Sequence, residues 1–212
     1  VYQLHRSITA GLHSLVGNLW AKQELDRLKR VFGVIELLFH FSTVFLFTCT
    51  GILIVPFVRV YTKGVTDANY IQPVFAALIV LAYAFACIKG SYNLLILASG
   101  HYKQTQRCHI NSAVLNVVVS IFTVYLFDLI GVAIGTLIAM GYQMVWIAYY
   151  NSKNLLKWPF SHFIKLISVD ILTVVIAVVA TFWINLDTID YLGWFVMAIK
   201  VAAIVSLIVI VM

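Results

Sequence analysis

Six long runs of apolar residues, separated by short polar segments, constrain this chain more than any other feature. The runs cover residues 31–58, 73–98, 110–127, 129–150, 166–186 and 191–212. About 18 apolar residues suffice to cross the bilayer core of about 30 Å, at about 1.5 Å per residue. A soluble core does not need this pattern six times in succession. The sequence therefore predicts an all-α, polytopic membrane bundle with six transmembrane helices, preceded by the end of an earlier one.

The composition agrees with a membrane location. Hydrophobic residues make up 63% of the chain and charged residues only 10%, against about 25% charged in a typical soluble domain. The net charge of +6 resides in loops beside the apolar runs, where orientation and lipid headgroups explain it. We therefore expect membrane lipids and no nucleic acid as partners. Cys49, Cys87 and Cys108 are far apart and lack metal-ligand spacing, so we expect no disulfide framework, metal or cofactor.

Lysine and arginine alternate in number from one polar segment to the next. Alternate segments hold nine on one side of the predicted membrane and two, Arg59 and Lys63, on the other. The nine are Lys22, Arg27, Lys29, Arg30, Lys103, Arg107, Lys153, Lys157 and Lys165. By the positive-inside rule, residues 21–30, 100–109 and 151–165 are cytoplasmic.

Two segments between the runs carry further predictions. Residues 110–150 hold a single charge, Asp128; as one helix they would extend about 60 Å, twice the bilayer core, so Asp128 marks a tight outer turn. Residues 155–167 mix apolar and cationic side chains. They predict either an amphipathic segment on the inner leaflet or a plain connector with interfacial aromatic residues. The chain starts at Val1 and stops inside an apolar run, so we expect a fragment of a longer protein.

Polar residues inside the runs are costly in hydrocarbon and mark candidate functional positions. Glu36, His40, Thr43 and Thr50 share one helical face. The pair Glu36 and His40 lies near the predicted cytoplasmic end, so it faces either an internal cavity or the solvated end of the helix. A second stripe consists of Ser112, Asn116, Ser120 and Thr123. It lines a shared polar interior or only bonds neighbouring helices together.

Lys89 is the most specific candidate, because it lies nine residues, about 13 Å, inside its run. It precedes Gly90, Ser91, Tyr92 and Asn93, a possible break in the helix. A cation there would bind an anionic substrate such as a lipid diphosphate; the alternative is snorkelling or a structural ion pair. Arg6 is a lesser candidate for the same cationic cavity. Lys200, in the last run, suggests snorkelling or pairing across helices.

Glycines in the fourth run predict close packing, whereas no enzyme signature is present. Gly131 and Gly135, continued by Ala139, form a small-xxx-small row. The chain contains neither a Gly-x-Ser-x-Gly nor a His-Glu-x-x-His motif. The outer loops are short, without room for a large external catalytic loop. We therefore expect no enzymatic activity.

Four segments in order resemble the polysaccharide-transporter branch of the multidrug/oligosaccharidyl-lipid/polysaccharide flippase superfamily. Residues 6–22 resemble the end of a span and its cytoplasmic loop, and 56–70 resemble the outer turn after the third helix of a repeat. Residues 97–106 resemble the cytoplasmic A-x-G-x-x-k-x-t turn. Asn116 and residues 131–136 resemble the following helix pair. The resemblance covers about residues 1–155; the last two spans fit by hydropathy only.

The resemblance implies that residues 1–150 are the C-terminal half of a flippase bundle. Residues 151–212 would be an amphipathic linker and two additional helices. The chain would then run from the end of the eighth span to the fourteenth, and an N-terminal half of the same protein would complete the cavity. The expected activity is flipping of a lipid-linked oligosaccharide or polysaccharide precursor across the bacterial cytoplasmic membrane by alternating access. The cavity candidates are Lys89, Glu36, His40, Arg6, Asn93 and Asn116.

Three alternatives stay open at this point. A drug/cation antiporter of the same superfamily would need carboxylates inside the membrane, and only Glu36 and Asp170 lie near it. An integral-membrane enzyme of glycan assembly is disfavoured by the short outer loops. A non-transporting membrane partner protein would not bring its polar stripes together.

Overall fold

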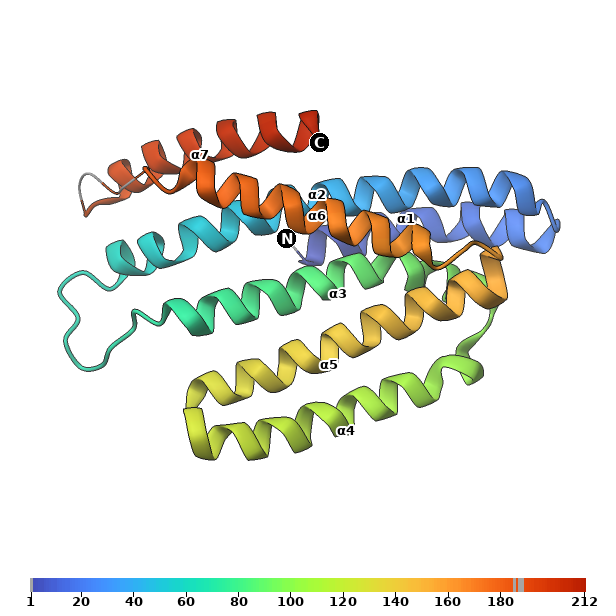
Figure 1. Cartoon of the computed structure of the whole chain (residues 1–212), viewed down its shortest axis with the longest axis horizontal. Coiled ribbons are helices and arrows are strands. Elements are labelled where there is room, and N and C mark those ends of the chain that lie inside the picture. The colour runs from blue at the N-terminus through green and yellow to red at the C-terminus, as the bar shows by residue number, and fades with distance from the viewer. Residues whose placement is uncertain (1, 185, 187–188) are drawn as a thin grey trace.

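The computed structural model describes residues 2–184, 186 and 189–212, which fold into seven α-helices and one short π-helix joined by turns and loops (Figure 1). For residues 2, 4–6 and 8 only the backbone is described. The elements are α1 (Tyr2–Ala21), α2 (Leu25–Tyr61), α3 (Pro73–Ser99), α4 (Tyr102–Phe127), α5 (Leu129–Tyr150), η1 (Asn151–Leu156), α6 (Ser161–Thr181) and α7 (Tyr191–Val211). Helices α2 to α7 are each long and apolar enough to cross a membrane. The prediction of an all-α bundle with six such helices is confirmed.

Several helices begin before the apolar runs that predicted them. Helix α2 begins at Leu25 rather than at residue 31, and α4 begins at Tyr102 rather than at residue 110. Hydropathy marks only the part of a helix that suits hydrocarbon, whereas Lys, Arg and Gln are good helix formers and continue the backbone hydrogen bonding into the polar segment. Gly100 ends α3 with a φ of +76°, a conformation that glycine adopts without steric cost.

The tight turn predicted at Asp128 is present. Helix α4 ends at Phe127 and α5 begins at Leu129, so Asp128 is the only residue between them. Its φ of +47° and ψ of −126° are close to those of the first central residue of a type II′ turn. The Asp128 amide donates to the carbonyl of Val124 at 2.9 Å, and its carbonyl accepts from Gly131 at 3.0 Å. Both helix ends are thereby hydrogen-bonded through one residue.

The helices alternate in direction, so that their connections gather at two ends of the bundle. The α1–α2, α3–α4 and α5–α6 connections lie at the right in Figure 1, and the α2–α3, α4–α5 and α6–α7 connections lie at the left. The three segments predicted to be cytoplasmic therefore share one end. This arrangement is that of a multi-pass membrane protein. Which end faces the cytoplasm stays a prediction.

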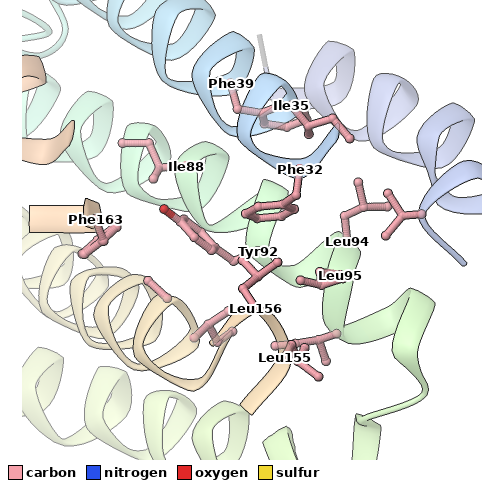
Figure 2. Packing of buried hydrophobic residues seen from close by; sticks show 14 of the residues in the cluster. Phe32, Ile35, Phe39, Ile88, Tyr92, Leu94, Leu95, Leu155, Leu156 and Phe163 are labelled. Atoms are coloured by element: carbon pink, nitrogen blue, oxygen red, sulfur yellow. The ribbon is translucent and has the colours of Figure 1, made fainter. Parts of the chain in front are cut away.

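A core of large apolar side chains fills the end of the bundle at which α5 connects to α6 (Figure 2). Phe32 of α2 is fully buried, and its ring lies close to those of Tyr92 on α3 and Trp158. Leu155 and Leu156 of η1 are each 2% exposed. The segment 155–167 thus packs much of its apolar side into the bundle rather than onto a leaflet. The reason is that η1 continues α5 and Lys157, at a φ of +54°, then turns the chain back along the bundle.

The outer faces of α4, α6 and α7 are apolar and exposed. The large exposed side chains on them include Val117, Phe122, Leu172, Val179, Ile199 and Leu207. The opposite face of α7 is buried: its stripe of Met197, Val201, Val205 and Val209 packs against α2 and α6. Apolar surface on this scale is unfavourable in water and is expected of helices whose outer face contacts lipid.

Candidate functional site

A buried carboxylate on α2 connects three helices. Glu36 is 1% exposed, and the hydroxyl of Tyr92 on α3 donates a hydrogen bond to its Oε1. Its Oε2 lies 3.1 Å from Nε2 of His162, near the start of α6. A buried carboxylate is strongly disfavoured unless it is paired and hydrogen-bonded. Here both oxygens have a partner, each from a different helix.

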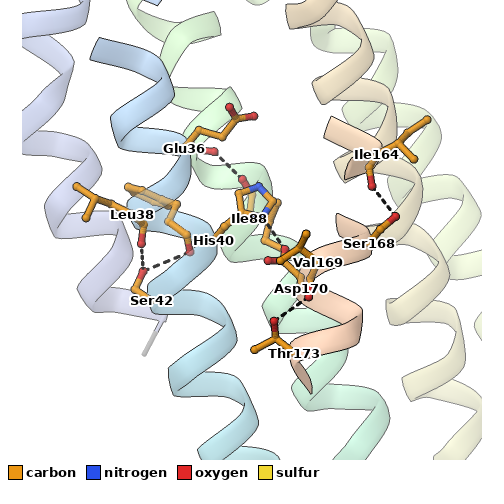
Figure 3. A network of polar contacts seen from close by, with 12 residues as sticks. Glu36, Leu38, His40, Ser42, Ile88, Ile164, Ser168, Val169, Asp170 and Thr173 are labelled. Carbon is orange, nitrogen blue, oxygen red and sulfur yellow. Dashed lines mark hydrogen bonds and ion pairs between the residues drawn. The ribbon is translucent and has the colours of Figure 1, made fainter. Parts of the chain in front are cut away.

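A second carboxylate–imidazole pair lies one helical turn further along α2. Nδ1 of His40 lies 2.5 Å from Oδ2 of Asp170 on α6, and both side chains are largely buried (Figure 3). The opposite nitrogen of the ring, Nε2, is buried and finds no hydrogen-bond partner within the described residues. Imidazole and carboxylate groups in contact can hold and exchange a proton. This part of the bundle therefore has two carboxylate–imidazole contacts between α2 and α6.

Lys89, one turn before Tyr92 on α3, belongs to a different cluster, which involves α4 and α5. Its Nζ donates to Oε1 of Gln143 on α5 at 2.5 Å. Nε2 of Gln143 in turn lies 3.4 Å from Nδ1 of His109 on α4. Lys89 is partly exposed, and among the described residues no carboxylate lies within ion-pair distance of it. The positive charge is thus held by a neutral amide and is not neutralised.

A groove between α3 and the first turns of α4 adjoins this cluster. It has a volume of about 330 Å³ and lies beside the α3–α4 connection. Asn93 is one turn after Lys89 on the same face of α3, and it lines the groove together with His109. Lys103 and Gln106 line its outer part. The predicted residues Lys89 and Asn93 are therefore neighbours, and His109 connects the groove to the lysine through Gln143.

Asn116 lies on the polar stripe of α4, which packs against the small-residue row of α5. Ser112 donates to the carbonyl of Ala139 at 3.0 Å, and Thr123 donates to that of Gly131 at 2.8 Å. Asn116 accepts from Ser120 at 3.1 Å on its own helix. The two patterns seen in the sequence, the polar stripe and the glycine row, thus form a single α4–α5 interface. A role of Asn116 toward substrate stays a prediction.

The six candidate residues do not line one common cavity in the described part of the chain. Glu36 and His40 join α2 to α3 and α6, whereas Lys89 and Asn93 face α4 and α5. The side chain of Arg6 lies outside the described residues. The structure therefore brings four of the candidates together as two separate pairs, one between α2, α3 and α6 and the other between α3, α4 and α5.

Sequence reasoning missed the partners of these residues. Gln143 is a lone amide in an otherwise apolar run, and such a costly polar residue could have been recognised in the sequence. Tyr92 and His162 gave no comparable signal, because a tyrosine in a span and a histidine in a short loop are both ordinary. Their role depends on their contacts with Glu36 of α2. Tyr92 is 56 positions away from Glu36 in the chain, and His162 is 126 positions away.

Comparison with protein-family models, curated proteins and solved structures finds no match to this chain.

Proposed function

We propose that this chain is part of a transporter that flips a lipid-linked oligosaccharide or polysaccharide precursor across the bacterial cytoplasmic membrane. Such a substrate combines a polyprenyl tail, which belongs in lipid, with a diphosphate and a sugar, which do not. A transporter for it needs membrane-spanning helices and a cation at membrane depth. The proposal includes the orientation given by the positive-inside rule, with residues 21–30, 100–109 and 151–165 in the cytoplasm.

The observation that carries the proposal is the uncompensated charge of Lys89. The residue lies about 15 Å from the end of α3 at Ser99 and about 24 Å from its start at Pro73. A charge at such depth costs about 2.5–3.5 kcal/mol on insertion scales. In a purely structural role we would expect a carboxylate partner, and the described residues offer none. A partly exposed ammonium that contacts the amide of Gln143, one turn before Asn93 on α3, suits a phosphate.

The same proposal assigns the chain to one wall of a larger transporter. Residues 1–150 would be the C-terminal half of the bundle and residues 151–212 the linker and two added helices. An N-terminal half of the same protein would supply the other wall. The two halves would expose the site to each side of the membrane in turn, as in other repeat-built transporters.

A second candidate function, a proton-coupled drug/cation antiporter, is favoured by the two carboxylate–imidazole pairs. Glu36 and Asp170 are the only carboxylates inside the apolar runs of the described residues, and each contacts a histidine. Glu36 is too deeply buried to contact a cationic drug directly. In an antiporter these groups would therefore carry the proton, and the substrate would bind elsewhere.

The test uses the full-length protein in vesicles that contain a fluorescent lipid-linked oligosaccharide. A membrane-impermeant quencher measures how fast the label moves between leaflets. We expect wild-type protein to accelerate flipping, and the charge-removing variant Lys89→Met to lose at least about tenfold in rate, the equivalent of one charge-assisted contact. The matched control is Lys165→Met, which removes an exposed cation near the start of α6.

The outcomes separate the candidates. Flipping that depends on Lys89 and not on Lys165 supports the flippase. Efflux of a cationic dye driven by a pH gradient, with no flipping of the lipid, supports the antiporter. Equal flipping by wild type and Lys89→Met, at equal protein levels, would refute the assignment of Lys89.

A further inference from the structure

Lys200 lies at the centre of α7 on the face that points away from the bundle. It is the tenth of the 21 residues of this helix and is exposed. The distances along the axis are about 14 Å to the first residue and about 17 Å to the last. The four-carbon stem of lysine is too short to bring its ammonium to either end. Lys200 therefore places a charge where the bilayer is most apolar.

The rest of this chain does not neutralise that charge. Within the described residues, Lys200 makes neither an ion pair nor a hydrogen bond. The buried stripe of α7, which includes Val201 and Val205, faces the other way, toward α2 and α6. The cost of an exposed charge at mid-membrane is substantial. A partner outside the described chain would remove it.

The residues around Lys200 form a seam of the kind that helices use to pack together. Val196, Lys200, Ala203, Leu207 and Ile210 are all exposed. Their spacings alternate between four and three residues, which is the pattern of a coiled-coil seam. Ala203, directly after the lysine along this seam, is small enough for a close approach of another backbone. A single charged residue in such a seam fixes the choice and register of its partner.

We propose that the α7 seam docks a transmembrane helix of a different polypeptide, which carries an Asp or Glu opposite Lys200. A second copy of this chain does not fit, because the carboxylates inside its apolar runs, Glu36 and Asp170, already contact His162 and His40 in the interior. Two copies meeting at this seam would also bring two lysines together. The carboxylates inside the apolar runs of the described chain are thus already paired, and the proposal assigns the complementary charge to another protein, with a further segment of the same polypeptide as the competing outcome of the test.

The test replaces Ala203 with a photo-reactive phenylalanine in the full-length protein, in the native membrane. The control position is Val117, an exposed residue near the middle of α4. We expect an adduct at Ala203 and not at Val117, and the peptide joined to it to be a membrane span that contains a carboxylate. Lys200→Met, which removes the charge from an exposed side chain, should reduce the adduct about tenfold, whereas Lys200→Arg should keep it.

A charge exchange completes the test. Lys200→Asp combined with substitution of the partner's carboxylate by Lys should restore the adduct that either change alone abolishes. Five results would overturn the proposal: an adduct to another segment of the same polypeptide, an adduct to a second copy of the chain, adducts to lipid only, an adduct unaffected by Lys200→Met, or no adduct above that at Val117. Thermal unfolding of each variant in detergent checks that the bundle is intact.

Discussion

Oε2 of Glu36 on α2 lies 3.1 Å from Nε2 of His162 on α6, although 126 positions separate the two residues in the chain. Tyr92 of α3 donates to the other oxygen of the same carboxylate. One turn later along α2, His40 meets Asp170 of the same helix α6. Two polar contacts in an apolar setting therefore fix how α6 is placed against α2. They make the position of α6 depend on two buried groups of α2, Glu36 and His40, as well as on packing.

The first prediction concerns the hydrogen bond from Tyr92 to Glu36. Tyr92→Phe removes the hydroxyl and leaves one carboxylate oxygen buried without a donor. We expect the free energy of unfolding to fall by about 1–3 kcal/mol, the usual cost of leaving a buried acceptor without a donor. Thermal unfolding in detergent measures the change. Tyr125→Phe is the control, because Tyr125 is 86% exposed and should tolerate the loss of its hydroxyl; equal losses in both variants would contradict the account.

The second prediction concerns the α4–α5 interface. A Cβ atom on Gly135 would lie 2.9 Å from the backbone nitrogen of Ser120 and 3.0 Å from the carbonyl oxygen of Asn116. Because backbone cannot move aside as a side chain does, Gly135→Ala should destabilise the protein by about 1–3 kcal/mol.

The matched control for Gly135→Ala is Gly141→Ala on the same helix. There the nearest atom to a new Cβ is a ring carbon of Phe85 at 3.5 Å, an ordinary contact. Alanine is also the better helix former, so we expect this variant to be neutral or stabilised by up to about 1 kcal/mol. If both variants unfold at the same temperature, the close approach of α4 and α5 is wrong.

The membrane spans could be predicted from the sequence because a helix that crosses hydrocarbon requires a long apolar run. This requirement predicts all six spanning helices and the turn at Asp128. It does not predict where α2 and α4 begin, since polar residues such as Arg27 and Arg107 extend a helix beyond the membrane core without changing its hydropathy signal.

The candidate site follows from the sequence only in part. Lys89, Glu36 and His40 stand out because a polar residue in an apolar run is costly, whatever its partner. Which helix supplies the partner depends on packing between segments far apart in the chain. His162 illustrates this: it belongs to a segment expected at the membrane surface, and α6 instead carries it to the buried oxygen of Glu36.

The third prediction concerns the orientation of the bundle. Single cysteines are introduced at Lys153, at the end predicted to be cytoplasmic, and at Thr66, at the opposite end; both positions are exposed. Cys49, Cys87 and Cys108 are first replaced by serine or alanine. In intact cells an impermeant maleimide should label Thr66→Cys and not Lys153→Cys, whereas permeabilised cells should show both. The reverse pattern would contradict the orientation given by the positive-inside rule.

The fourth prediction separates a binding role of Lys89 from a structural one. Lys89→Met keeps the length of the side chain and removes the charge together with the hydrogen bond to Gln143. No carboxylate of the described chain is left unpaired by this change. We therefore expect the melting temperature to be unchanged or higher, since the cost of a charge in the membrane disappears. A marked fall in melting temperature would indicate that Lys89 acts chiefly to hold α3 against α5.

The most direct test of the central claim is equilibrium binding of a polyprenyl diphosphate to the full-length protein in detergent. The matched ligand is the polyprenol of the same length, which lacks the diphosphate. We predict that wild type binds the diphosphate at least about tenfold more tightly than the alcohol, and that Lys89→Met binds the two equally. A preference for the diphosphate that survives in Lys89→Met would contradict the account, as would the absence of any preference in wild type.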